Sequence, residues 1–197
     1  MEKQMIISIG REYGSGGHEI AEKLAKKYDL PLYDHNFLDE LAEKKNLDKK
    51  ALTEFDEARV NKLLSRTVKG MNNSPAYNVA NLQFDFLREL AQEGKSFVVV
   101  GRCSEYVLKD SEALFSTFIY STKQARIDRL VNKLHISEKE AFNIMRIKDA
   151  KRRKYHDEHS PIKWGKNKGY DLCINSSKLG IDKTVDLIAS YIDLKYE

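Results

Sequence analysis

A short apolar segment followed at once by a run of glycines constrains this chain most strongly. Residues 5–9 read Met-Ile-Ile-Ser-Ile, and the turn that follows, residues 10–18, holds four glycines. An apolar segment without polar alternation is typical of a central parallel strand, which is buried on both faces. From Glu19 to Tyr28, apolar residues recur at helical spacing. A strand, a glycine turn and a helix in this order predict the opening unit of an α/β fold.

The rest of the chain alternates between strand and helix patterns in the same way. Four further short strands are predicted, at residues 31–33, 97–100, 114–120 and 170–174. Ser137 and Glu140 form the Ser-x-x-Glu pattern of a capping box, so a long helix is expected to begin there, and residues 181–196 predict a last helix. Residues 67–77 are rich in Gly, Asn and Ser and predict an exposed connection. The expectation is a three-layer α/β/α fold around a central, mainly parallel five-stranded sheet.

The composition is that of a folded protein without a membrane segment. The 197 residues are 41% hydrophobic and include only 3 prolines, which excludes a disordered or low-complexity chain. Cys103 and Cys173 are far apart and fit neither a metal spacing nor a disulfide framework. No apolar run approaches the ~20 residues that a membrane span requires. We therefore expect a cytoplasmic protein with no membrane partner.

The glycine turn has the features of a phosphate cradle. Glycines let the backbone aim successive N–H groups at one point, and the start of the next helix adds a partial positive charge. The alternative is a tight strand-to-helix turn that binds nothing. Because the turn follows the first strand, where ligands of such sheets bind, we favour the phosphate hypothesis. The candidate contacts are Gly14, Ser15, Gly16, Gly17 and His18.

Two nucleotide-binding motifs each match this turn only in part. A Walker A loop, Gly-x-x-x-x-Gly-Lys-Ser/Thr, would need glycine, lysine and a hydroxyl where Arg11, Gly17 and His18 stand. The dinucleotide fingerprint Gly-x-Gly-x-x-Gly matches Gly14 and Gly16 but not its third glycine, and Asp34 lies at the distance of a ribose-binding acid. Neither motif decides the ligand alone.

Residues 146–154 concentrate positive charge. They hold six Lys or Arg and one Asp, a larger excess than the +4 of the whole chain. A solvated helix face is one explanation, and an anionic partner is the other. Arg126 and Arg129 on the preceding helix, with Arg102 directly after a strand, favour the anion, since a guanidinium donates two parallel hydrogen bonds to phosphate. Nucleic acid is disfavoured because Tyr155 is the one aromatic residue beside the cluster.

Together these segments resemble the cytidylate kinase-like family of P-loop nucleoside monophosphate kinases. The similar landmarks follow one another along nearly the whole chain, at residues 7–17, 32–34, 99–103, 125–129, 148–153, 164–165 and 170–177. The resemblance implies a single domain, residues 1–197. Its parts are a core of residues 1–35, 95–135 and 168–197, a helical acceptor-binding insertion at about 36–94, and a basic lid at about 137–167.

The resemblance also implies ATP and Mg²⁺ as cofactors and small-molecule nucleotides as partners, and it leaves a homodimer open. Arg11 and residues 14–18 would bind the donor phosphates, while Asp34, Arg102 and Lys151 would bind the acceptor. The implied catalytic residues are Arg102, Arg126, Arg129, Lys148, Asp149, Arg152 and Arg153.

The expected activity is transfer of the ATP γ-phosphate to a nucleoside monophosphate, with CMP or dCMP favoured. Two departures from the family pattern bear on it: the P-loop lysine is absent, and Cys103 stands where cytidylate kinases have an acid. Another cation, from Arg11 or the lid, would have to act between the phosphates. One alternative is a non-catalytic nucleotide- or phosphoanion-binding protein of the same fold. A nicotinamide-dependent oxidoreductase is a third hypothesis, which the many cations disfavour.

Overall fold

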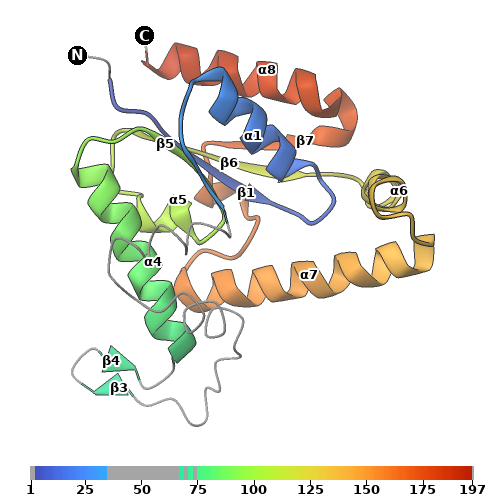
Figure 1. The fold of residues 1–197 in the computed structure, drawn as a ribbon, viewed down its shortest axis with the longest axis horizontal. Coiled ribbons are helices and arrows are strands. Elements are labelled where there is room, and N and C mark those ends of the chain that lie inside the picture. The colour runs from blue at the N-terminus through green and yellow to red at the C-terminus, as the bar shows by residue number, and fades with distance from the viewer. Residues whose placement is uncertain (1–2, 35–66, 69–70, 73–74, 197) are drawn as a thin grey trace.

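A parallel sheet of five strands forms the centre of the molecule (Figure 1). The computed structural model describes residues 3–34, 67–68, 71–72 and 75–196. The strands lie in the order β2-β5-β1-β6-β7, and each neighbouring pair is parallel. Their bounds are β1 (Ile6–Arg11), β2 (Leu32–Tyr33), β5 (Phe97–Val100), β6 (Leu114–Tyr120) and β7 (Leu172–Asn175). The predicted five-stranded α/β fold is confirmed.

The two faces of the sheet bury two separate apolar cores. The face under α1 and α8 takes Ile7 and Ile9 of β1, and the opposite face takes Ile6 together with residues of α4 and α5. Because β1 is central, both sets of its side chains are buried, which accounts for its unbroken apolar sequence. The helices are α1 (Gly17–Lys27), α8 (Ser176–Tyr196), α4 (Pro75–Gln92) and α5 (Ser104–Val107), arranged as Figure 1 shows.

Two further helices extend the molecule beyond the sheet. They are α6 (Lys123–Leu134) and α7 (Glu138–His159), which share a small core of Ile127, Leu130, Ala141 and Met145. The predicted capping box at the start of α7 is present: Ser137 and Glu140 satisfy each other's backbone N–H groups. In Figure 1, α7 runs from α6 back toward α4 and α5, past the edge of the sheet.

Two sequence expectations change in detail. Within residues 67–77, predicted to be an exposed connection, β3 (Thr67–Val68) pairs antiparallel with β4 (Met71–Asn72), and α4 already begins at Pro75. Proline suits this position because the first helical N–H has no intrahelical acceptor. The last helix starts at Ser176, five residues before the prediction, with a break at Gly180, whose φ is 73°. The helical prediction for residues 36–94 is confirmed in α4, and its part at 36–66 lies outside the described residues.

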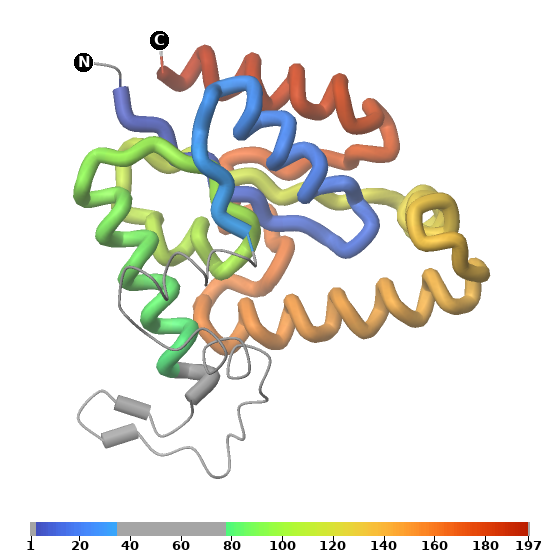
Figure 2. The backbone as a smooth tube through the Cα atoms, in the orientation of Figure 1, coloured from blue at the N-terminus to red at the C-terminus, as the bar shows by residue number. Residues whose placement is uncertain are grey.

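The chain ends lie together, and the short helix η2 (Asn167–Gly169) leads into β7. The tube in Figure 2 shows the N- and C-terminal segments side by side, and Lys3 Nζ donates to the Tyr196 carbonyl at 3.0 Å. Within the described residues, no helix is both long and apolar enough to cross a membrane.

Candidate functional site

The glycine turn between β1 and α1 has a backbone that other residues could not adopt without displacing their neighbours. Gly14 and Gly16 lie in the left-handed region, with φ of 82° and 84°. A Cβ at Gly16 would lie 2.3 Å from Ile181 Cδ1, and one at Gly14 would lie 3.1 Å from the Arg126 carbonyl oxygen. The turn is therefore shaped by α6 and α8 as well as by its own sequence.

Buried hydroxyls hold the turn in this conformation. The Ser15 hydroxyl donates to the Glu12 carbonyl at 2.9 Å. The buried Ser176 hydroxyl lies 2.6 Å from the Ser15 carbonyl oxygen and 3.2 Å from that of Tyr120. Sequence reasoning assigned Ser176 no role, although it falls in the landmark at residues 170–177. Its position after β7 connects the last strand to the turn and fixes the turn's backbone.

The start of α1 lies beside the end of β2. The helix begins at Gly17, so the N–H groups of its first turn have no intrahelical acceptors and can bind an anion. His18 Nε2 lies 3.3 Å from Glu22 Oε1 and 3.7 Å from Asp34 Oδ2. Asp34, predicted from the sequence to be an acceptor-side residue, is thus next to the donor-side turn.

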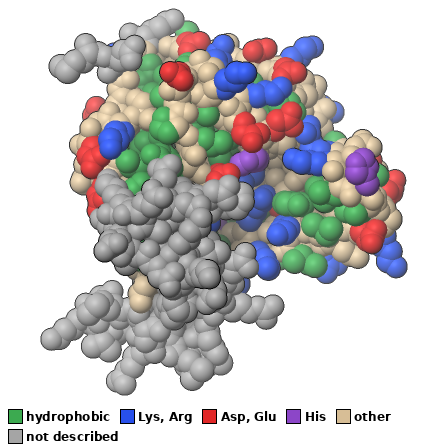
Figure 3. Space-filling model, viewed as in Figure 1, with side chains coloured by type: hydrophobic (Ala, Val, Ile, Leu, Met, Phe, Trp, Pro, Cys, Tyr) green, Lys and Arg blue, Asp and Glu red, His purple; other side chains and the backbone are tan. Residues whose placement is uncertain are grey.

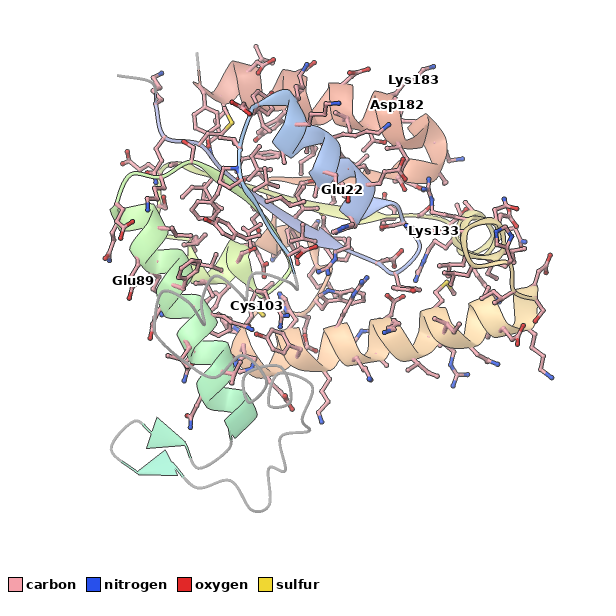
Figure 4. All side chains as sticks on the ribbon, viewed as in Figure 1. Glu22, Glu89, Cys103, Lys133, Asp182 and Lys183 are labelled. Atoms are coloured by element: carbon pink, nitrogen blue, oxygen red, sulfur yellow. The ribbon has the colours of Figure 1, made fainter. Side chains whose placement is uncertain are left out.

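The turn after β5 has a strained backbone. Gly101, Arg102 and Cys103 have consecutive positive φ values of 77°, 59° and 52°. Two neighbouring non-glycine residues in the left-handed region cost free energy and persist where the surroundings impose them, commonly at functional sites. The Cys103 thiol, labelled in Figure 4, lies 3.9 Å from the His156 carbonyl on α7, and the Arg102 guanidinium lies 5.8 Å from the Tyr155 ring centre.

Three arginines converge where these turns meet. Arg11 ends β1, and its side chain passes so close to the β5 turn that a Cβ at Gly101 would lie 2.1 Å from Arg11 Nη1. Arg152 on α7 donates from Nη1 to the Arg11 carbonyl at 3.4 Å. Burial, followed by the positive charges of Arg152 and Arg102, lowers the pKa of Arg11 to about 9, while Asp34 partly opposes this effect. Arg11 Nε is buried and has no hydrogen-bond partner among the described residues. Converging, half-buried cations of this kind favour a bound anion.

Buried ion pairs anchor α7 to the glycine turn. Asp149 accepts a hydrogen bond from the Tyr13 backbone N–H at 2.7 Å and pairs with Arg126. Arg126 in turn donates from Nε to the Tyr13 carbonyl at 2.7 Å and pairs with Glu12 at 3.0 Å. Only 8% of the Arg126 side chain is exposed. These contacts make Arg126 and Asp149 positioning residues for the turn, and contact of Arg126 with a phosphate stays a prediction.

The remaining predicted cations lie around the site rather than within it. Arg129 pairs with Glu19 at 3.0 Å and lies against Gly16, whose Cβ would be 3.3 Å from Arg129 Cζ. Lys148, Lys151 and Arg153 are exposed on α7, and the Arg153 guanidinium lies 5.6 Å from the Trp164 ring centre. On the face of the molecule shown in Figure 3, Lys and Arg side chains lie on the part that α6 and α7 form. Phosphate contacts of these exposed cations stay predictions.

Two further side chains lie near the site. His156 Nε2 lies 2.6 Å from Glu105 Oε1, which joins the end of α7 to α5. Tyr170 lies below the end of β1, where a Cβ at Gly10 would be 3.1 Å from its hydroxyl oxygen, and burial raises its pKa. Among the described residues, no group of three or more His, Cys, Asp or Glu could hold a metal ion.

The arginine convergence predicts that inorganic phosphate stabilises the protein. Phosphate that binds only the folded state adds about 2.7 kcal/mol at one hundred times its dissociation constant. For a chain of this length, that corresponds to a rise of about 5–10 °C in the melting temperature. Differential scanning fluorimetry in phosphate, against sodium chloride at equal ionic strength, measures it. An equal shift in both salts would contradict a specific anion site.

The fold and site define a class: an α/β protein with a glycine turn after the first strand and arginines at the ends of neighbouring strands. Residues 6–178 match the cytidylate kinase-like family. The chain belongs to this family, which places it among kinase-like proteins. No protein with a curated description matches the sequence.

Solved structures share the fold. An uncharacterized protein from Eubacterium ventriosum is 36% identical, with a TM-score of 0.77 over 96% of this chain and 99% of that one. Shikimate kinase from Bacteroides thetaiotaomicron is 12% identical, with a TM-score of 0.55 over 96% of this chain and 98% of that one. At this low identity, the second likeness shows the fold alone.

Proposed function

We propose that this protein is a nucleoside monophosphate kinase that transfers the γ-phosphoryl group of ATP to a nucleoside monophosphate, with CMP or dCMP as the favoured acceptor. One observation carries the proposal: Arg11, Arg102 and Arg152 converge beside the glycine turn, from two strand ends and from α7. Phosphoryl transfer needs mainly such positioned cations, because little covalent chemistry is left for the protein to perform.

The two ends of the site suit the two substrates. The backbone N–H groups at residues 14–18 would bind the donor phosphates at the positive end of α1. Arg102, held by the strained turn after β5, would bind the acceptor phosphate, and Asp34, which follows β2, would line the acceptor side. An oxygen of the acceptor phosphate would attack the γ-phosphorus in line, the bond to the bridging oxygen would break, and ADP would leave. Arg152 would lie between the two sides.

The residues present also suit ATP with Mg²⁺. The buried Arg11 Nε, which has no hydrogen-bond partner in the described part of the chain, and the glycine backbone at residues 14–17 fit a polyphosphate. Mg²⁺ neutralises charge on the phosphates, and it is held largely by phosphate oxygens and water with one or two carboxylates. Asp34 is our candidate for that carboxylate, because it lies beside the start of α1.

We expect ATP-dependent turnover with a pyrimidine monophosphate. ADP release would be followed with a coupling enzyme, in the presence of Mg²⁺, for each ribo- and deoxyribonucleoside monophosphate in turn. The highest kcat/KM is expected with CMP or dCMP. Shikimate is the control acceptor, because a shikimate kinase has the same fold as this protein. The proposal would be contradicted if shikimate were the one acceptor that is phosphorylated, or if none of the acceptors supported ADP release.

A second function is favoured by one specific observation. Gly17 and His18 stand where a P-loop has the lysine and the hydroxyl that contact the phosphates and Mg²⁺. A non-catalytic nucleotide- or phosphoanion-binding protein of the same fold needs neither group. Tight ATP binding in calorimetry, combined with no transfer to any acceptor, would support this function in place of the kinase.

A further inference from the structure

The Arg11 side chain fills the space that a side chain at residue 17 would need, and this bears on the missing lysine. A Cβ at Gly17 would lie 2.5 Å from Arg11 Cβ and 3.1 Å from Arg11 Cγ. Real Cβ atoms essentially never lie within 3.0 Å of a non-bonded heavy atom. Here the contacting atoms belong to the base of the arginine side chain, which cannot move away as its flexible end could. With Arg11 present, a side chain at residue 17 therefore requires the backbone of the turn to shift.

The far end of the Arg11 side chain lies at the meeting point of the site. Nη1 lies against Gly101 at the turn after β5, so the side chain crosses from the end of β1 below the glycine turn. The buried Nε has no partner among the described residues, and the charges of Arg152, Arg102 and Asp34 all act on the guanidinium. The Arg11 side chain thus runs from the start of α1, where its Cβ and Cγ lie against Gly17, to the turn after β5, where it places a planar group with five N–H donors.

We propose that Arg11 and Gly17 are an exchanged pair, in which Arg11 supplies from the strand the cation that a P-loop lysine supplies from the helix. Gly17 is then required to make room for the arginine. The inference rests on the proposed function for the donor-phosphate side, and it adds which residue neutralises the donor phosphates. Because the guanidinium also lies near Arg102, the same group would contact phosphates on both sides of the transfer.

Restoring a standard P-loop tests the exchange. Arg11→Gly, Gly17→Lys and His18→Ser together create Gly-x-x-x-x-Gly-Lys-Ser in this turn. Gly17→Lys alone is expected to lower the melting temperature clearly, because the new Cβ meets Arg11. Arg11→Gly alone is expected to fold and to lose about 10- to 100-fold in affinity for inorganic tripolyphosphate, as expected for the loss of charged hydrogen bonds. The triple variant is expected to regain both the melting temperature and most of the affinity.

Two controls make the test specific. Arg88→Ala removes an exposed arginine of α4 that pairs with Asp85, and it should leave tripolyphosphate affinity unchanged. Arg11→Lys keeps a cation on the strand side and should retain more affinity than Arg11→Gly. Tripolyphosphate binding is measured by isothermal titration calorimetry and stability by scanning fluorimetry, so neither measurement depends on turnover.

The outcomes separate this inference from the proposed function. If Arg11→Gly binds tripolyphosphate like the wild type, or if Gly17→Lys melts like the wild type, the exchange is overturned while the kinase stands. If the wild type binds tripolyphosphate through Arg11 but transfers no phosphate, the exchange stands and the kinase fails. If the wild type binds neither tripolyphosphate nor ATP, both fail together.

Discussion

Replacing Arg152 by alanine should lower kcat about 100- to 1000-fold without unfolding the protein. Arg152 is half-buried on α7, donates to the Arg11 carbonyl at 3.4 Å, and holds its guanidinium 5.2 Å from the Tyr13 ring centre. Its pKa is lowered, chiefly by burial, so its charge is poorly compensated by water. A preorganised cation of this kind stabilises charge that develops in the transition state, and losing one such group commonly costs this much.

The measurement is kcat and KM from the coupled ADP assay with saturating ATP and the best acceptor. Arg146→Ala is the matched control, because Arg146 lies on the same helix but is exposed to solvent. Arg152→Lys should recover little, since an ammonium cannot reproduce two parallel hydrogen bonds. An unchanged kcat for Arg152→Ala, or an equal loss for Arg146→Ala, would show that α7 acts through overall charge and not through this residue.

Replacing Asp149 by alanine should destabilise the fold and loosen the glycine turn. Only 15% of the Asp149 side chain is exposed, and its carboxylate joins the Tyr13 N–H to the buried Arg126. Removing one partner of a buried ion pair leaves an uncompensated charge and costs about 3–5 kcal/mol. For a protein of this size, the melting temperature should fall by roughly 10 °C.

Hydrogen exchange separates an effect on the turn from a general loss of stability. In Asp149→Ala, the Tyr13 amide should exchange faster than the amides of β5, whose four residues are fully buried. Asp149→Asn keeps an oxygen acceptor for the Tyr13 N–H and should give an intermediate result. Asp128→Ala on α6 is the control, because that carboxylate makes an exposed contact with Gln124. A melting temperature within 1 °C of the wild type would contradict the anchoring of α7 by Asp149.

The fold could be predicted because its signals are local. The apolar strands at residues 97–100 and 114–120 and the capping box at Ser137 depend on neighbours in the sequence, and all three are confirmed. The first turn of α8, before the break at Gly180, was missed because the prediction began the last helix at residue 181. The pair β3–β4 was missed since two-residue strands carry almost no periodicity.

The candidate site was predictable only as a set of residue types. The resemblance to the family grouped Arg126, Asp149 and Arg152 together as catalytic residues, without distinguishing their surroundings. The structure gives them different surroundings: Arg126 and Asp149 bind the glycine turn, while Arg152 lies with Arg11. The pairing of His156 with Glu105 joins residues 51 positions apart, which no local pattern records.

By itself, the sequence determined an apolar strand followed by a glycine turn, and a concentration of cations in residues 146–154 that is too strong for a neutral ligand. These properties depend on backbone freedom, burial of apolar side chains and net charge, and residues close together in the sequence determine all three. Only the tertiary structure decided which cations meet. Arg11, Arg102 and Arg152 come from two strand ends and a helix, and Arg11 excludes a side chain at Gly17 through a contact that only close packing creates.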